Sequence, residues 1–173
     1  MRGVVLGAAF VFFAGALFAQ PKTETFTSTD GRYTVRFPGK PKITTPTAKS
    51  AIGDLQVIVA TYATADANVY LTSHTDYPTA ATKAENRKTL FDGIQNGLRG
   101  SKGKIVSEKE FEFGPDKLPG REVVVDKDMG KQRVKFKVVL RDNRLYQIAV
   151  IGTADFVSSK DATAFVESLE LTK

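Results

Sequence analysis

The chain has 173 residues, with 25 Lys and Arg against 19 Asp and Glu, one histidine and no cysteine. The missing cysteine excludes disulfides, a thiolate nucleophile and a thiolate metal site, and one histidine is too few for a histidine-rich zinc site. The net charge of +6 favours anionic partners, although only weakly.

The first nineteen residues have the layout of a secretory signal peptide. Arg2 precedes an apolar run from Val4 to Phe18, and the small residue Ala19 follows it. We expect cleavage after Ala19, with Ala16 as the alternative site. The run is shorter than the roughly twenty residues of a membrane-spanning helix, and no second run follows. The sequence therefore predicts an exported protein, periplasmic or extracellular, without a transmembrane span after cleavage.

Residues 20–173 suit one domain, large enough to bury about 70% of the surface of the unfolded chain. Tyr33, Val35 and Phe37 share one face of a strand predicted over 32–37, and Pro38 ends it. Further strands are expected at 43–45, 53–63 and 68–77, the last two joined as a hairpin by the loop 64–67.

The pattern then changes to helical spacing and predicts one helix over residues 80–99, ended by Gly100. Its apolar positions are Leu90, Phe91, Ile94 and Leu98. Gly93 and Gly97 lie four residues apart and each costs the helix about 1 kcal/mol, so we expect them to allow tight packing on a sheet.

Four more strands follow, predicted at 104–113, 118–127, 132–141 and 144–152, with turns at 128–130 and 142–143. A second helix is expected from Ser158 onward, with an apolar stripe of Ala162, Phe165, Val166 and Leu169. The fold class is therefore α+β, with an antiparallel sheet on which two main helices pack.

A basic row is the most distinctive charge feature. Residues of alternating position along the strand at 132–141 place four cations on one face, namely Lys131, Arg133, Lys135 and Lys137. Neighbouring cations would lie about 7 Å apart, close enough to act together on an anionic glycan, lipid or other polymer. These four residues are the predicted anion-binding site.

The alternative is a neutralised surface. Glu108, Glu110 and Glu112 share one face of the strand at 104–113, and Glu122 and Asp126 lie on the strand between them and the basic row. Cross-strand pairing of opposite charges would then leave a solvent-exposed ladder worth only tenths of a kcal/mol per pair.

Catalysis would have to rest on His74 and Asp76, which point to the same face of one strand. They form half of a hydrolase relay, with Ser50 or Ser107 as the nucleophile. The chain has no Gly-x-Ser-x-Gly elbow, however, and two polar residues two apart on a strand are common. We therefore expect a structural histidine and no catalytic residue.

Metal and nucleic-acid sites have little support. Glu122, Asp126 and Asp128 cluster around one turn, but their spacing matches no calcium loop, so we expect no metal and no cofactor. Aromatic residues are not interleaved with the basic ones, which argues against nucleic acid. The glycine-rich segment 100–104 follows a helix instead of preceding one, so it is not a phosphate loop.

The opening segment 26–39 runs through a phenylalanine, a turn with Gly31, an alternating strand and Pro38. This resembles exported bacterial proteins with a PsbP-like domain. The resemblance implies a central antiparallel sheet with helices on its faces, an α/β/α sandwich, as in PsbP and the Ran-binding Mog proteins. Photosystem PsbP is an accessory subunit that helps retain inorganic cofactors, but no matching functional residue is found here.

The function expected from these observations is that of an exported, non-catalytic accessory or binding domain. Its partner would be an envelope protein or an anionic polymer. Weak electrostatic binding of an anionic glycan or lipid through the basic row is the alternative, and a hydrolase that uses His74 and Asp76 is a third hypothesis.

Overall fold

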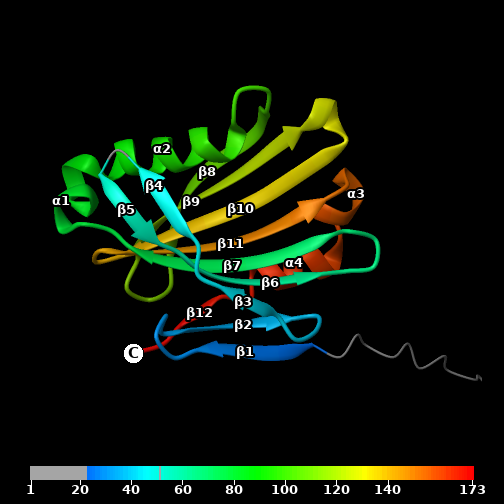
Figure 1. The fold of residues 1–173 in the computed structure, drawn as a ribbon, viewed down its shortest axis with the longest axis horizontal. Helices are drawn as coiled ribbons and strands as arrows, with labels where there is room; N and C mark the ends of the chain where they lie inside the picture. The colour runs from blue at the N-terminus through cyan, green and yellow to red at the C-terminus, as the bar shows by residue number, and fades with distance from the viewer. Residues whose placement is uncertain (1–22, 51) are drawn as a thin grey trace, which may run out of the picture.

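The computed structural model describes residues 23–50 and 52–173, so the predicted signal peptide over 1–19 lies outside the described residues. Within them, seven antiparallel strands form the central sheet in the order β3-β6-β7-β11-β10-β9-β8 (Figure 1). These strands are β3 (Lys42–Thr44), β6 (Ile58–Ala63), β7 (Val69–Asp76), β8 (Lys104–Phe113), β9 (Leu118–Lys127), β10 (Gln132–Arg141) and β11 (Arg144–Gly152).

The pairing of β7 with β11 joins the two β-rich halves of the chain into one sheet. Tyr70 lies opposite Val150, and His74 lies opposite Tyr146. The sequence permits this arrangement without requiring it. The predicted bounds of β8, β9, β10 and β11 are confirmed, because residues such as Asp142, with φ of 56°, close tight turns between the strands.

The predicted strand over 53–63 is wrong as a single element. β5 (Gly53–Gln56) pairs with β4 (Thr47–Ser50) in a separate two-stranded hairpin, whereas β6 pairs with β7 in the central sheet. The break falls at Val57, whose N–H donates to the carbonyl of Pro46 at 3.0 Å. This bond continues the β4-β5 pairing by one residue, and from Ile58 onward the chain pairs with β7 instead.

The predicted helix over 80–99 is divided. It consists of α1 (Thr79–Thr82), the short 3-10 helix η1 (Ala84–Asn86) and α2 (Arg87–Arg99). Lys83 has extended backbone angles, with ψ of 152°, and this ends α1. α2 ends at Gly100 as predicted, with φ of 63°.

The predicted C-terminal helix is α4 (Lys160–Val166), and a separate short helix α3 (Ala154–Val157) precedes it. The cap of α4 is Ser159 instead of the expected Ser158, because the Ser159 hydroxyl accepts a hydrogen bond from the amide of Ala162 at 3.2 Å. A second sheet combines β1 (Glu24–Ser28), β2 (Tyr33–Phe37) and β12 (Glu170–Leu171) in the order β1-β2-β12. Of these three strands, the sequence predicted only β2.

The central sheet separates two cores. On one face, Phe91 of α2 packs with Val123, Val125 and Phe136 of the sheet. The other face packs against α3, α4 and the β1-β2-β12 sheet, where the Phe37 and Phe165 rings lie 4.9 Å apart in an edge-to-face arrangement. The architecture is therefore the predicted α+β sandwich. No helix in the described part of the chain has both the length and the apolarity needed to cross a membrane.

Gly93 and Gly97 do not bring α2 close to the sheet, contrary to the prediction. A Cβ atom at either position would meet nothing within 4 Å, and both residues are exposed. The buried positions of α2 are Phe91 and Gln95, two residues away from each glycine. At 3.6 residues per turn, two residues rotate a side chain to the opposite side of the helix. The glycines therefore face outward.

Candidate anion-binding site

Strand pairing places the basic row beside charged residues of β8 and β9. Residues directly opposite each other in an antiparallel pair share a face of the sheet. Arg133 lies opposite Asp126, which lies opposite Lys104; Lys137 lies opposite Glu122, which lies opposite Lys109. Three strands thus build two columns in which a carboxylate stands between two cations.

The sequence prediction missed Lys104 and Lys109. Simple alternation along β8 puts Lys104 on the face of Glu108 and Lys109 on the opposite one. A β-bulge between Ile105 and Ser107 adds one residue and reverses the alternation, so that Lys104 and Lys109 share a face. A bulge of this kind has no clear sequence signal, although the two lysines themselves are visible in the sequence.

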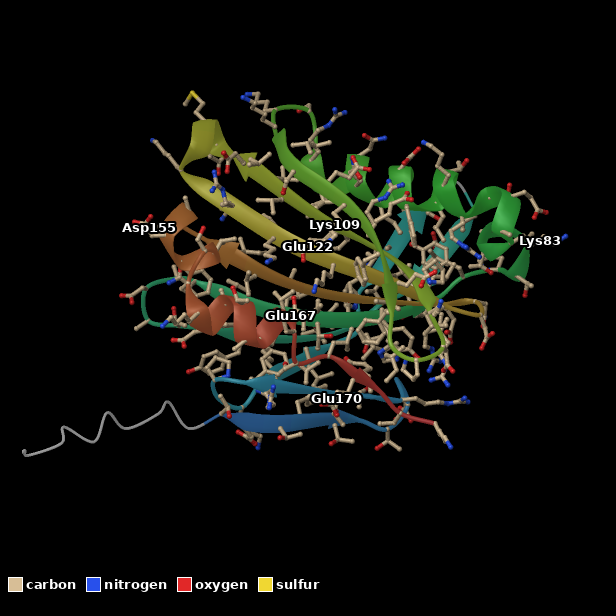
Figure 2. All side chains as sticks on the ribbon, turned by 180° about the vertical axis from the view of Figure 1, so that it is seen from behind. Lys83, Lys109, Glu122, Asp155, Glu167 and Glu170 are labelled. Carbon is tan, nitrogen blue, oxygen red and sulfur yellow. The ribbon has the colours of Figure 1, made fainter. Side chains whose placement is uncertain are left out.

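The carboxylates on this face are fully engaged. Asp126 accepts two hydrogen bonds from Arg133, at 2.6 and 2.9 Å, and this contact holds the pKa of Asp126 below its usual range. Glu122 is shared between Lys135 at 3.7 Å and Lys137 at 3.5 Å. Lys137 also contacts Glu167 at 2.5 Å, at the end of α4. Figure 2 shows Lys109 and Glu122 beside each other, with Glu167 below them.

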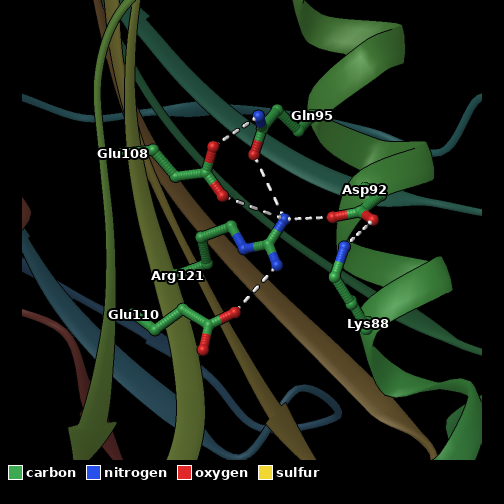
Figure 3. Close-up of polar contacts among 6 residues, drawn as sticks. All are labelled: Lys88, Asp92, Gln95, Glu108, Glu110 and Arg121. Carbon is green, nitrogen blue, oxygen red and sulfur yellow. Dashed lines mark hydrogen bonds and ion pairs between the residues drawn. The ribbon is translucent and has the colours of Figure 1, made fainter.

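The expected acidic row lies on the opposite face of the sheet. Glu110 lies opposite Arg121 and Glu108 opposite Val123, so both glutamates point toward α2 (Figure 3). Arg121, which is 2% exposed, contacts Glu110 at 2.9 Å, Glu108 at 3.4 Å and Asp92 of α2 at 2.6 Å. The interpretation that Glu108, Glu110 and Glu112 neutralise the basic row is therefore wrong, because β8 turns them away from it. The other part of that interpretation is confirmed, because Glu122 and Asp126 of β9 do pair with Arg133, Lys135 and Lys137.

The result is a positively charged surface, which we call the basic face. Its strand residues are Lys104, Lys109, Glu122, Asp126, Arg133, Lys135 and Lys137. Five cations and two carboxylates leave a formal charge of +3, and Glu167 reduces it to +2. Lys104 and Lys109 are exposed, whereas the side chains of Arg133, Lys135 and Lys137 are 15–24% exposed. Lys131, the first residue of the predicted row, is exposed in the turn before β10.

His74 and Asp76 are not arranged as a relay. His74 is 2% exposed, and its Nδ1 atom has no hydrogen-bond partner among the described residues. Burial lowers the pKa of His74, and nearby Arg144 lowers it further. Asp76 instead accepts two hydrogen bonds from Arg144, both at 2.6 Å. The hydroxyl of Ser50 donates to the carbonyl of Gly53, in the β4-β5 hairpin.

The turn with Glu122, Asp126 and Asp128 gathers no metal ligands. Asp126 is held by Arg133, and Glu122 by two lysines, so both carboxylates face cations. Within the described residues, no group of three His, Asp or Glu side chains is placed to hold a metal ion.

Comparison with known proteins identifies the fold. No protein-family model and no curated protein sequence matches the chain. The solution structure of cyanobacterial PsbP (CyanoP) from Synechocystis sp. PCC 6803 superposes with a TM-score of 0.59 at 13% identity, covering 96% of this chain and 98% of that one. A protein of unknown function, PA94 from Pseudomonas aeruginosa, reaches a TM-score of 0.38 at 6% identity, covering 78% and 85%. On the strength of the first of these superpositions, and of the sandwich described above, this chain has a PsbP-like fold.

Proposed function

We propose that this chain is an exported, non-catalytic binding domain that holds an acidic polymer on its basic face. One observation carries the proposal: β8 directs Glu108 and Glu110 to Arg121 on the other side of the sheet. Among the described residues, the ion pairs of the five strand cations of the basic face therefore involve only three carboxylates, Glu122, Asp126 and Glu167, and a positive charge remains. The leader-like residues 1–19 support export.

The spacing of the cations suits a partner with repeated negative charges. Arg133, Lys135 and Lys137 follow one another about 7 Å apart along β10, and the lysines of β8 lie about 10 Å away across two strands. These separations are close to the Debye length of about 8 Å at physiological salt, so neighbouring cations reinforce one another. An acidic polysaccharide presents charged groups at similar intervals, and it is the partner that we propose.

The test is the midpoint of thermal unfolding with dextran sulfate, polygalacturonate or neutral dextran, at low and high salt. Binding to the folded state raises the midpoint by mass action. We expect both acidic polymers to raise it at low salt, the shift to vanish near 1 M salt, and neutral dextran to have no effect. A shift with neutral dextran, or none with either acidic polymer, would contradict the proposal and favour a protein partner.

A charge-neutralising variant locates the site. Lys104→Gln/Lys109→Gln/Lys135→Gln removes three of the five cations of the basic face and should abolish most of the shift. Vesicles of anionic lipid, tested in parallel by sedimentation, distinguish a lipid surface from a polysaccharide. Binding to vesicles alone would assign the face to lipid and overturn the polysaccharide assignment.

The matched control removes the same charge elsewhere. Lys40, Lys49 and Lys83 are exposed and lie outside the basic face, on the loop after β2, on β4 and after α1. The triple variant Lys40→Gln/Lys49→Gln/Lys83→Gln should keep the shift. Equal losses in both triple variants would show that only net charge matters.

A further inference from the structure

A groove of about 860 Å³ lies between α2, the segment 77–81 and the β4-β5 hairpin. Tyr77, Leu90 and Ile94 line it from the helical side, and Ile52 lines it from the hairpin. Ile52 is 47% exposed, although isoleucine is among the residues most often buried. The volume falls within the range of ligand-binding clefts, which are mostly apolar. This groove is distinct from the basic face and lies beside α2.

The lining of the groove is uncharged, and two of its four polar side chains, Ser50 and Asn86, already donate hydrogen bonds within the protein. None of the lining residues that the structure describes is Lys, Arg, Asp or Glu. The Ser50 hydroxyl donates to the carbonyl of Gly53 at 2.7 Å, and the Asn86 amide donates to the carbonyl of Ala80 at 2.8 Å. The remaining polar side chains, the hydroxyls of Tyr77 and Thr89, are too few to pair with the successive backbone groups of a polypeptide, so burying a peptide here would be costly. A hydrocarbon needs no partners.

Gly93 is the second observation that points to a ligand. It faces the groove, and a Cβ atom at this position would meet nothing within 4 Å. Packing of α2 on the sheet therefore does not explain this glycine, which weakens the helix. The absence of a side chain at Gly93 does keep the groove open, since any larger residue would project into it.

We propose that this groove binds the hydrocarbon chain of an uncharged or weakly polar lipid-like molecule. The chain lies against Leu90, Ile94 and Tyr77, passes over Gly93 and is covered by Ile52 of the hairpin. Burial of apolar surface supplies the binding energy, so the complex is insensitive to salt. The proposal is independent of the basic face, because high salt should abolish the binding of an acidic polymer to that face and leave hydrocarbon binding in the groove unchanged.

The probe for the test is diphenylhexatriene, an uncharged hydrocarbon that fluoresces in apolar surroundings and has no attraction to the basic face. We expect saturable fluorescence with one probe per chain, equal at low and high salt, and displacement by hexadecanol. A leucine-rich peptide should not displace the probe. Fluorescence that does not saturate, or displacement by the peptide and not by hexadecanol, would overturn the proposal.

Two variants on the same helix give the matched comparison. Gly93→Leu fills the groove and should weaken probe binding at least tenfold. Gly97→Leu makes the same change one turn later. A Cβ atom there also meets nothing within 4 Å, but Gly97 does not line the groove. It should bind the probe like the wild type. Leucine favours the helix over glycine, so both variants should fold. Equal weakening in both would overturn the assignment of the site.

Discussion

Arg121 and Asp92 form an ion pair of 2.6 Å that links β9 to α2. The guanidinium is 2% exposed and also contacts Glu108, Glu110 and the amide oxygen of Gln95, so one side chain contacts three carboxylates, two on β8 and one on α2. The hydrogen bond from Lys88, and after it the hydrogen bond from Arg121, holds the pKa of Asp92 below its usual range. The pair therefore joins α2 to the sheet, in addition to the apolar packing of Phe91.

Arg121→Lys should destabilise the protein by about 1–3 kcal/mol, because one ammonium group cannot reproduce the forked contacts of a guanidinium. The change keeps the positive charge, so a loss of stability would come from the lost hydrogen-bond geometry of the guanidinium. The free energy of unfolding, measured in urea, tests this. Lys88→Met is the comparison, since Lys88 makes an exposed i,i+4 pair with Asp92 that is worth about 0.5 kcal/mol or less. Equal losses in the two variants would show that burial of Arg121 contributes nothing.

His74 should make the free energy of unfolding fall as the pH falls below 6.5. Its pKa in the folded state is lowered from 6.5, mainly by burial and then by Arg144, while Asp76 and Asp30 act in the opposite direction. Between the lowered pKa and 6.5 the unfolded chain binds a proton that the folded chain does not, so stability falls with falling pH by up to about 1.4 kcal/mol per pH unit. His74→Gln should flatten this dependence in urea unfolding.

The ring signals of the single histidine provide an independent readout by NMR titration. Asp76→Asn removes a charge that raises the pKa of His74 and leaves Arg144 without its ion pair, so the pKa should fall further. A rise in the pKa of His74 would contradict this account of its surroundings.

Two glycine-to-alanine substitutions should change the stability of the protein in opposite directions. Gly97→Ala places a methyl group in open space on α2 and should stabilise the protein by up to about 1 kcal/mol. Gly120→Ala should destabilise it, because the new Cβ would lie 2.5 Å from the Phe111 ring and 2.9 Å from the carbonyl of Val138. Thermal unfolding measures both. A stabilising Gly120→Ala would mean that Phe111 has room to move.

Glu122→Gln should strengthen the binding of acidic polymers. Glu122 contacts both Lys135 and Lys137, and its removal raises the formal charge of the basic face by one unit. The midpoint shift with dextran sulfate at low salt should therefore increase. Glu85→Gln, an exposed change after α1, is the control for net charge. A weaker shift in Glu122→Gln would indicate that Glu122 orients the lysines for binding.

Local patterns predicted much of the fold. Apolar alternation and turn residues placed the four strands from Lys104 to Gly152 correctly, and helical spacing predicted α2 and its end at Gly100. They failed where pairing with other segments decides the conformation: the predicted strand over 53–63 is divided because β5 pairs with β4 whereas β6 pairs with β7. Lys83, with its extended backbone angles, divides the predicted helix. β12 has only two residues and forms because β2 is there to pair with it.

The amino-acid sequence by itself determined the four strands from Lys104 to Gly152, the cysteine-free composition and the basic row on β10, because side-chain alternation within one strand is a local property. Only the tertiary structure decided which charges meet. The bulge between Ile105 and Ser107 arises from pairing with β9, and it moves Lys104 onto the face of Lys109. The same pairing directs Glu110 to Arg121. Register is a property of two strands together, so no single segment encodes it.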